Sequence, residues 1–378
     1  MKRKIISLLM IFVFVLTSCK NNQDNVNQSD VNQKEATQNI ATKDNTDEEY
    51  EKYTDTFFEV FDTIISFTAY TQSKEEYDKY YTVVKSEFER LHKLYTHFDE
   101  YEGINNIKTI NDNAGVEPVK VDKDLFDLIK FSKEMTEKYS DKTDMAFGPV
   151  LDVWHKYREE GMKNPDDAKV PTKEELKNAS THTNIKKVIL NEEDQTVFLE
   201  EKGMALDLGA TSKGFASQIV MDKVKEAGCK YAILSAGGNI IALERPNIEG
   251  RDKWAIGVQD PDVEGEEEKQ PIEIIRGNNI SIVTSGDYQR FYTVDGKRYA
   301  HIIDPETLQP AEKFKSVTII TKDSGLADYL STTLFILDQE KGLELLNKFE
   351  DAEAMWVDKD GNIKQTEGFK EYTKKIEA

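Results

Sequence analysis

The sequence predicts an α+β fold in which mixed, largely antiparallel sheets and packed helices form a single folded unit. Strands joined by short polar turns support this prediction, and the strongest hairpin signal is Asp295-Gly296 between 289–294 and 297–303. Helices instead follow one another in blocks, as at 325–337 and 340–349. This arrangement favours antiparallel pairing over a doubly wound parallel sheet.

The first half of the chain predicts two amphipathic helices and two stretches of strand. Weak alternation indicates a strand over 58–70, and a polar turn between 187–190 and 196–199 indicates a hairpin. A second helix is expected over 123–140. The first helix has apolar residues spaced 3, 4, 3 and 4 apart, which places them on one face: Tyr81, Val84, Phe88, Leu91 and Tyr95.

The second half predicts a helix over 212–227 and then mostly strands. Gly228 is a suitable C-terminal stop for that helix. A last hairpin is expected to turn at 358–361. Further strands are predicted by short apolar runs at 231–234, 240–243, 254–258, 280–284 and 316–321.

The N-terminus predicts export and lipid attachment. A basic start is followed by an apolar run of about 12 residues, which is too short to span a membrane. The small residues before Cys19 resemble a lipobox, so residues 1–18 are expected to be a lipoprotein signal peptide and Cys19 the lipidated N-terminus. An ordinary cleaved signal peptide is the alternative.

Residues 19–52 have the composition of a flexible tether, and residues 53–378 are expected to form the folded domain. The tether is rich in Asn, Gln, Asp and Thr and has almost no large apolar residue before Tyr50. Such a segment buries too little surface to offset the entropy of ordering it. The net charge of −21 and the lack of a basic stripe exclude nucleic acid as an expected partner.

A strand-to-turn-to-helix segment at 205–216 is the first candidate for chemistry. Asp207 ends an apolar strand, Gly209 permits close approach, and Lys213 stands at the start of the helix, where amide groups favour anionic oxygen. The alternative is a capped turn with a solvated lysine. The segment 235–239 can likewise contact a ligand through its adjacent glycines or form a simple tight turn.

The remaining candidates lie at 284–287, 301–305 and 328–332. His301 stands between strand residues Tyr299 and Ile303 on one face, where a histidine is either a core residue or a base or phosphate donor. Asp328 and Thr332 are four residues apart on a helix and share a face. These two oxygen ligands suit magnesium better than zinc, although for such a pair taken alone a hydrogen bond along the helix is the more frequent explanation.

Taken together, these segments resemble the FAD:protein FMN transferase family, the ApbE-like flavin transferase lipoproteins. The resemblance covers about 58–345 and rests on the order of six motifs: LDLGATSKGFA, SAGGN, WAIGVQDP, TSGDYQRFY, GKRYAHIIDP and ADYLSTTLF. It implies that the chain cleaves FAD and attaches FMN through a phosphoester to a threonine or serine of an exported target protein, releasing AMP. It also implies a lipid-anchored enzyme on the extracytoplasmic face of a bacterial cell membrane.

The resemblance implies roles for individual residues. Magnesium is expected on the Ala210 carbonyl, Asp328 and Thr332, and His301 is the expected catalytic residue. The expected FAD contacts are Phe98, Lys142, Thr143, Asp144, Asp207, Lys213 and Ile302.

Two positions depart from the family pattern. Phe61-Asp62-Thr63 stands where Met-Gly-Thr is frequent, and Thr143 stands where an aromatic residue is frequent. Two other functions use the same residues: hydrolysis of FAD to FMN and AMP by a pyrophosphatase, and capture of a flavin by a non-catalytic surface lipoprotein.

Overall fold

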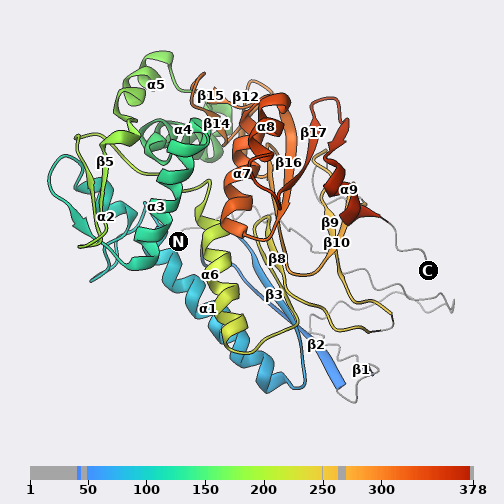
Figure 1. Ribbon diagram of the computed structural model, residues 1–378. Helices are drawn as coiled ribbons and strands as arrows, with labels where there is room; N and C mark the ends of the chain where they lie inside the picture. Colours follow the sequence, from blue (N-terminus) through green and yellow to red (C-terminus); the bar gives the residue numbers. More distant parts are fainter. Residues whose placement is uncertain (1–40, 44–48, 249, 263–269, 375–378) are drawn as a thin grey trace.

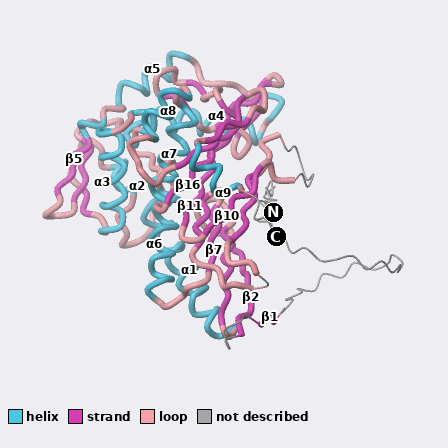
Figure 2. Tube along the Cα trace, turned by 45° about the vertical axis from the view of Figure 1, so that its right-hand side comes forward, coloured by secondary structure: helices cyan, strands magenta, loops and turns pink. Residues whose placement is uncertain are grey.

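The computed structural model describes residues 41–43, 49–248, 250–262 and 270–374. The predicted signal peptide and Cys19 lie outside these residues. Helices gather on one side of the molecule and strands on the other (Figure 2). The α+β prediction is therefore confirmed. No helix in the described part of the chain is long and apolar enough to cross a membrane.

A nine-stranded sheet forms the centre of the described structure, and all its neighbouring strands are antiparallel. Its order is β1 (Ala41–Lys43), β2 (Glu49–Phe57), β3 (Ile65–Thr71), β7 (Ala232–Ala236), β8 (Asn239–Ala242), β11 (Ile280–Gly286), β16 (Phe314–Thr321), β17 (Glu353–Asp358) and β18 (Ile363–Gln365).

Both faces of this sheet are covered, which explains why its central strands are buried along most of their length. Every residue of β7 is buried, and Ile233 and Leu234 belong to hydrophobic clusters on opposite faces. A strand buried on both faces loses the alternation of polar and apolar residues that marks a half-exposed strand. Trp254 and Phe369 pack on the face that carries Ile233.

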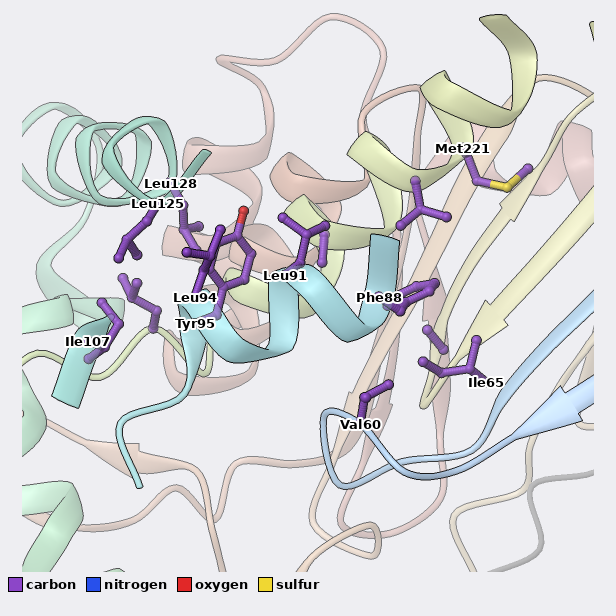
Figure 3. Close-up of a cluster of buried hydrophobic side chains, with 14 of the residues drawn as sticks. Val60, Ile65, Phe88, Leu91, Leu94, Tyr95, Ile107, Leu125, Leu128 and Met221 are labelled. Atoms are coloured by element: carbon purple, nitrogen blue, oxygen red, sulfur yellow. The ribbon is translucent and has the colours of Figure 1, made fainter. Parts of the chain in front are cut away.

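Helices α1, α6 and α7 lie over the other face (Figure 1). Four of the five residues of the predicted stripe on α1 are buried, and Tyr81 is partly buried. The stripe packs against the sheet and against α3, as Phe88, Leu91 and Leu125 illustrate (Figure 3). Each such side chain stabilises the fold by about 1.5–3 kcal/mol. The helices are α1 (Lys74–Tyr95), α2 (Ile107–Asp112), α3 (Lys123–Lys138), α4 (Gly148–Lys163), α5 (Lys173–Ala179), α6 (Ser212–Glu226), α7 (Ser324–Ile336), α8 (Gln339–Leu346) and α9 (Glu367–Thr373).

Smaller sheets and short 3-10 turns complete the described structure. The sheets pair β4 (Val119–Lys120) and β5 (Val188–Asn191) with β6 (Thr196–Leu199), β9 (Trp254–Val258) with β10 (Glu273–Gly277), β12 (Phe291–Val294) with β13 (Lys297–Ala300), and β14 (Ile303–Asp304) with β15 (Gln309–Pro310). The turns are η1 (Asp141–Thr143), η2 (Met145–Phe147), η3 (Pro165–Asp167), η4 (Ser180–His182) and η5 (Ile185–Lys187).

Two predicted boundaries need correction. The strand expected over 58–70 begins only at Ile65, because the segment before it is a loop in which Phe61 and Asp62 have positive φ. The sheet also includes 41–43 and 49–52, which the sequence analysis assigned to the tether. Glu51 pairs with Thr71 of β3, so at least this end of the segment belongs to the folded domain.

Candidate functional site

The predicted phosphate-binding segment lies at the start of α6. Asp207 is fixed by one backbone and one side-chain hydrogen bond. Its amide donates to the Met145 carbonyl at 2.8 Å, and its Oδ1 accepts from the Gly209 amide at 2.7 Å. α6 then begins at Ser212, and the side chain of its N-cap, Thr211, makes no capping hydrogen bond. The first amides of the helix therefore need another partner.

Asp328 of α7 supplies that partner. Its Oδ2 accepts from the Gly214 amide at 2.8 Å, and its side chain is almost fully buried, with an exposed fraction of 3%. Lys213 Nζ lies 4.0 Å from the other carboxylate oxygen. Burial raises the pKa of Asp328, while the opposing effects of Lys213 and the Gly214 amide favour the charged form.

The close approach of α6 and α7 depends on Gly214. A Cβ at this position would lie 2.1 Å from the Ser324 carbonyl oxygen and 2.6 Å from the Asp328 Cβ. No side chain fits at these distances, so the GFA part of the motif is explained by helix packing at the site.

The predicted magnesium ligands lie on these same two elements. Thr332 is one turn beyond Asp328 on α7, and its hydroxyl lies 3.2 Å from the Ser285 hydroxyl. Ala210 immediately precedes the start of α6. Within the described residues, no three His, Cys, Asp or Glu side chains form a metal-binding group. A carbonyl, a hydroxyl and one carboxylate nevertheless suit magnesium, which prefers oxygen ligands and retains several waters or substrate oxygens.

An unpartnered oxygen lies in the neighbouring SAGGN segment. Asn239 is 1% exposed, and its Oδ1 has no hydrogen-bond partner in the structure. Its side chain also favours the charged form of Asp328, which places it near the carboxylate. A buried oxygen of this kind is satisfied when water or a cation enters the site, and this observation supports the fit to magnesium.

His301 follows β13, which ends at Ala300, so the expected strand face shared with Tyr299 and Ile303 does not form. The ring Nδ1 lies 3.1 Å from the Arg290 carbonyl oxygen. Because a carbonyl only accepts, Nδ1 carries the proton and Nε2 keeps a free lone pair. Burial lowers the pKa of His301 to about 3, with further contributions from Arg290, Arg158 and Lys213. The imidazole is therefore neutral near pH 7.

The segment 142–144 is joined to the segment that follows His301. Lys142 Nζ lies 3.0 Å from Asp304 Oδ1 and 3.0 Å from Glu306 Oε2, so two carboxylates already neutralise this predicted FAD contact. The Thr143 hydroxyl lies 3.0 Å from that of Thr333 on α7.

Asp144 and Ile302 differ in what they can offer a ligand. Asp144 Oδ1 accepts from the Ala146 amide at 2.7 Å, and burial raises its pKa to about 6. The Ile302 side chain is buried, and it contributes to the cluster that packs around α7.

Phe98 has an exposed aromatic ring that lies next to two histidine rings. Its exposed fraction is 47%, and its centroid lies 3.9 Å from that of His97 and 4.9 Å from that of His155 on α4. An exposed ring of this kind is available for stacking on a flat ligand.

The loop Phe61-Asp62-Thr63, which departs from the family pattern, has positive backbone φ angles of the kind that glycine adopts most easily. Asp62 has φ of 48°, although aspartate stands where the family often has glycine. Thr63 packs so closely on Gly237 that a Cβ there would lie 2.1 Å from the Thr63 hydroxyl. Arg290 donates to the Asp62 carbonyl at 2.9 Å, which links this loop to the His301 segment.

Sequence reasoning missed Arg158, Arg290, Asn239 and Ser285 as residues of the site. Arg290 and Ser285 lie inside the TSGDYQRFY motif and Asn239 ends SAGGN, so the motifs contained a signal for these three. Arg158 lies on α4, a helix that the sequence analysis did not predict, and no motif marks it.

The fold and the site define a class of protein: an α+β protein in which a lysine and a buried carboxylate meet at the start of a helix, with a neutral histidine in the same site. The model of the ApbE family matches residues 61–356. The chain belongs to the ApbE family, which confirms the resemblance seen in its motifs.

Individual relatives agree with this assignment. The chain is 32% identical over 279 residues to a FAD:protein FMN transferase of Klebsiella pneumoniae, covering 72% of this chain and 83% of that protein. It is 33% identical over 284 residues to one of Treponema pallidum, covering 72% and 76%. The crystal structure of the ApbE protein from Thermotoga maritima superposes with a TM-score of 0.73 at 28% identity, covering 86% of this chain and all of that one.

Proposed function

We propose that this protein is a magnesium-dependent FAD:protein FMN transferase that attaches FMN to a threonine or serine of an exported protein and releases AMP. Its relatives identify the chain as an enzyme of the transferase class. The observation that carries the proposal is the Nε2 of the neutral His301, which the contact of Nδ1 with the Arg290 carbonyl leaves free, in the electrostatic field of Lys213 at the start of α6. This arrangement joins a base to a site for anionic oxygen.

His301 and the acceptor hydroxyl carry out the proton transfer in this proposal. The hydroxyl oxygen attacks the phosphorus of the FMN half, and its proton passes to Nε2 of His301. The bond from that phosphorus to the bridging oxygen breaks, and AMP leaves with the electron pair. A neutral imidazole with a free Nε2 lone pair suits this role.

Lys213 binds the charged oxygens during this step, since the Ser212 and Gly214 amides at the start of α6 already donate to the Leu208 carbonyl and to Asp328. Phosphoryl transfer depends mostly on positioning and charge stabilisation, because little covalent chemistry is required of the protein. Asp328, Thr332 and the Ala210 carbonyl are the residues that would hold magnesium. When bound, this ion supplies charge neutralisation to the pyrophosphate.

The remaining predicted contacts orient the two ends of FAD. Phe98 offers an exposed ring for stacking. Asp207 is held rigidly beside Gly209, and Asp144 and Thr143 lie on the turns that lead into α4. Lys142 does not offer a free charge to the phosphate. It acts through its ion pair with Asp304, which fixes the segment next to His301.

We also propose that lipidation of Cys19 anchors the enzyme on the extracytoplasmic face of a bacterial membrane. The lipobox-like sequence before Cys19 supports this location. Cys19→Ala is expected to move the protein from the membrane to the soluble fraction without changing its activity. Retention in the membrane fraction would show that a different element anchors the chain.

Incubation of the purified enzyme with FAD and magnesium tests the reaction. With a protein acceptor present, AMP should appear in equal amount to FMN bound to that acceptor, and chelation of the metal should stop both. Rapid release of AMP and free FMN without any acceptor would identify a pyrophosphatase. FAD binding that requires no metal and gives no turnover would identify a flavin-binding lipoprotein.

A further inference from the structure

Three side-chain hydroxyls form a row where β11 meets α7. The Ser285 oxygen lies 2.8 Å from that of Ser331 and 3.2 Å from that of Thr332. Ser331 in turn lies 3.0 Å from the backbone carbonyl oxygen of Asp328. Both serines are buried, so water has little access to the inner part of the row. The row therefore connects the side chain of one predicted magnesium ligand to the backbone of another.

The direction of these hydrogen bonds follows from the carbonyl at one end. A carbonyl oxygen only accepts, so the single hydroxyl proton of Ser331 is donated to Asp328. The bond between Ser331 and Ser285 then uses the proton of Ser285. With that proton used, the bond between Ser285 and Thr332 uses the proton of Thr332. The whole row thus donates in one direction, away from Thr332.

This direction determines what the Thr332 hydroxyl offers to a ligand. Its proton points toward Ser285, and its oxygen keeps lone pairs for a second partner. A cation binds to the lone pairs of an oxygen, so a hydroxyl that ligates magnesium must point its proton elsewhere. Thr332 is partly exposed, whereas Ser285 and Ser331 are buried, so Thr332 is the member of the row that a ligand reaches.

We propose that Ser285 and Ser331 are positioning residues that hold the Thr332 hydroxyl in the orientation required by a divalent cation. This inference rests on the proposed function for the assignment of Thr332 as a magnesium ligand. It deepens that assignment, because it gives the serine of the TSGDYQRFY motif a task that requires no contact with FAD or with the metal. Without the row, the Thr332 hydroxyl rotates freely and its proton is able to point toward the cation.

A second hydroxyl pair on the central sheet provides the matched control. Thr284 of β11 and Thr318 of β16 have their hydroxyl oxygens 2.9 Å apart. Neighbouring residues of a strand point to opposite faces, and Ser285 faces α7, so Thr284 and its partner lie on the other face. Thr318→Val removes one hydroxyl from this pair and leaves the row at Ser285 intact.

Titration with Mn²⁺, followed through the electron paramagnetic resonance signal of the free ion, tests this inference on the full-length protein. Manganese takes the same oxygen ligands as magnesium, and the measurement requires neither FAD nor turnover. Wild type should bind the ion, and Ser285→Ala should weaken that binding by about two- to tenfold, the net effect of one hydrogen bond. Thr318→Val should bind as tightly as wild type, and equal weakening in this control would contradict the inference.

Ser331→Ala tests the direction of the row. Its removal releases the proton of Ser285, which is then free to be donated to Thr332. The Thr332 oxygen loses a lone pair in this arrangement, and its own proton turns toward the site. Ser331→Ala should therefore also weaken Mn²⁺ binding, although two hydrogen bonds separate Ser331 from the Thr332 oxygen.

A double-mutant cycle separates this role from a structural one. In Thr332→Val the hydroxyl that Ser285 orients is absent, so the addition of Ser285→Ala should not weaken Mn²⁺ binding further. A serine that only joined β11 to α7 would weaken binding by the same factor in both backgrounds. Circular dichroism checks that each variant is folded, and Ser285→Thr, which keeps the hydroxyl, should bind more tightly than Ser285→Ala.

Failure of this inference differs from failure of the proposed function. If wild type binds no Mn²⁺, or if Ser285→Ala or Ser331→Ala binds it as tightly as wild type, the serines only pack α7 on the sheet and the inference is wrong. The proposed function then still stands if the protein transfers FMN to an acceptor. If both variants weaken Mn²⁺ binding but wild type transfers no FMN, the role of the row stands and the proposed function is wrong.

Discussion

Asp328 has a structural task beside its predicted magnesium task. Its carboxylate accepts from the Gly214 amide at the start of α6, where Thr211 provides no side-chain cap. Loss of the acceptor leaves a buried amide without a partner.

Substitution of Asp328 separates the two tasks. Asp328→Ala should lower the free energy of unfolding by about 1–3 kcal/mol, because the Gly214 amide loses its partner. Asp328→Asn keeps an oxygen for that amide but removes the charge, so it should stay near wild-type stability and lose magnesium-dependent transfer. Denaturant unfolding and transfer assays measure both effects. Wild-type transfer by the asparagine variant at ordinary magnesium would place the metal elsewhere.

The pH dependence of the reaction tests the state of His301. A base with a pKa of about 3 is deprotonated throughout the range from pH 5 to 7, so protonation of His301 should reduce kcat/KM only as the pH falls toward 3. In the enzyme–substrate complex, the negative pyrophosphate offsets the cations that lower the pKa of His301. The fall in kcat should therefore occur at a higher pH than the fall in kcat/KM. His301→Ala should slow transfer by about 10²–10⁴-fold.

The titration of Asp144 must be distinguished from that of His301 in this experiment, because burial raises the pKa of Asp144 to about 6. A fall in kcat/KM near pH 6 that disappears in Asp144→Asn belongs to the aspartate. A fall near pH 6.5 that persists in this variant would contradict the lowered pKa of His301.

The site residues that could be predicted from the sequence are those marked by their spacing on a helix or by their place in a motif. Asp328 and Thr332 share a face of α7 as their spacing requires, and Lys213 stands in the first turn of α6. Arg158 could not be found in this way, because a single arginine on a helix has no local signal. Its significance comes from the distant segments that lie beside it in the fold.

At the scale of elements, the site depends on how closely α6 and α7 pack. Gly214→Ala should force these helices apart, since its Cβ would lie 2.1 Å from the Ser324 carbonyl oxygen. We expect a loss of more than about 2 kcal/mol in unfolding free energy and loss of magnesium-dependent transfer, because overpacking costs 1–3 kcal/mol and the Asp328 contact is displaced. Thermal unfolding and transfer assays measure these effects.

Gly342→Ala is the control for that substitution. Gly342 lies within α8, and its Cβ would lie 3.4 Å from Leu334 and 3.7 Å from Trp356, which are ordinary contacts. Alanine there should be neutral or stabilising by up to about 1 kcal/mol, because glycine is unfavourable inside a helix. Equal behaviour of the two variants would show that close packing at Gly214 is not required.

Elements with strong periodicity were predicted correctly, and elements with conflicting signals were not. The helix with Phe88 and Leu91 on one face is confirmed as α1, and the Asp295-Gly296 hairpin as β12–β13. α4 was missed because it begins with Gly148-Pro149, a pair that usually indicates a turn, although proline is well tolerated in the first turn of a helix.

At the scale of the whole molecule, β2 is the first long strand of the central sheet, and β1 adds only three residues at its edge. β2 pairs with β3 from Glu51↔Thr71 to Phe57↔Ile65 inside the sheet. A chain beginning at Glu49 should fold and remain active, because it keeps this strand. A chain beginning at Phe58 should lose the native circular dichroism spectrum, because β3 would become an exposed edge. Native folding of the shorter chain would show that β2 is dispensable.

The order of strands in the central sheet could not be predicted from the sequence. A central strand such as β7 is short and buried on both faces, so the sequence identifies the strand but not its neighbour. Family membership, in contrast, was identifiable from the order of six motifs, and the match to residues 61–356 confirms it.

Covalent transfer of FMN to another protein is the central claim, and intact mass spectrometry of the acceptor tests it most directly. The enzyme is co-expressed with candidate exported acceptors, and each acceptor is weighed and then fragmented. The account predicts an added FMN mass on one threonine or serine, absent when the enzyme carries Asp328→Asn. Acceptors that remain unmodified while FAD is converted to free FMN and AMP would contradict it.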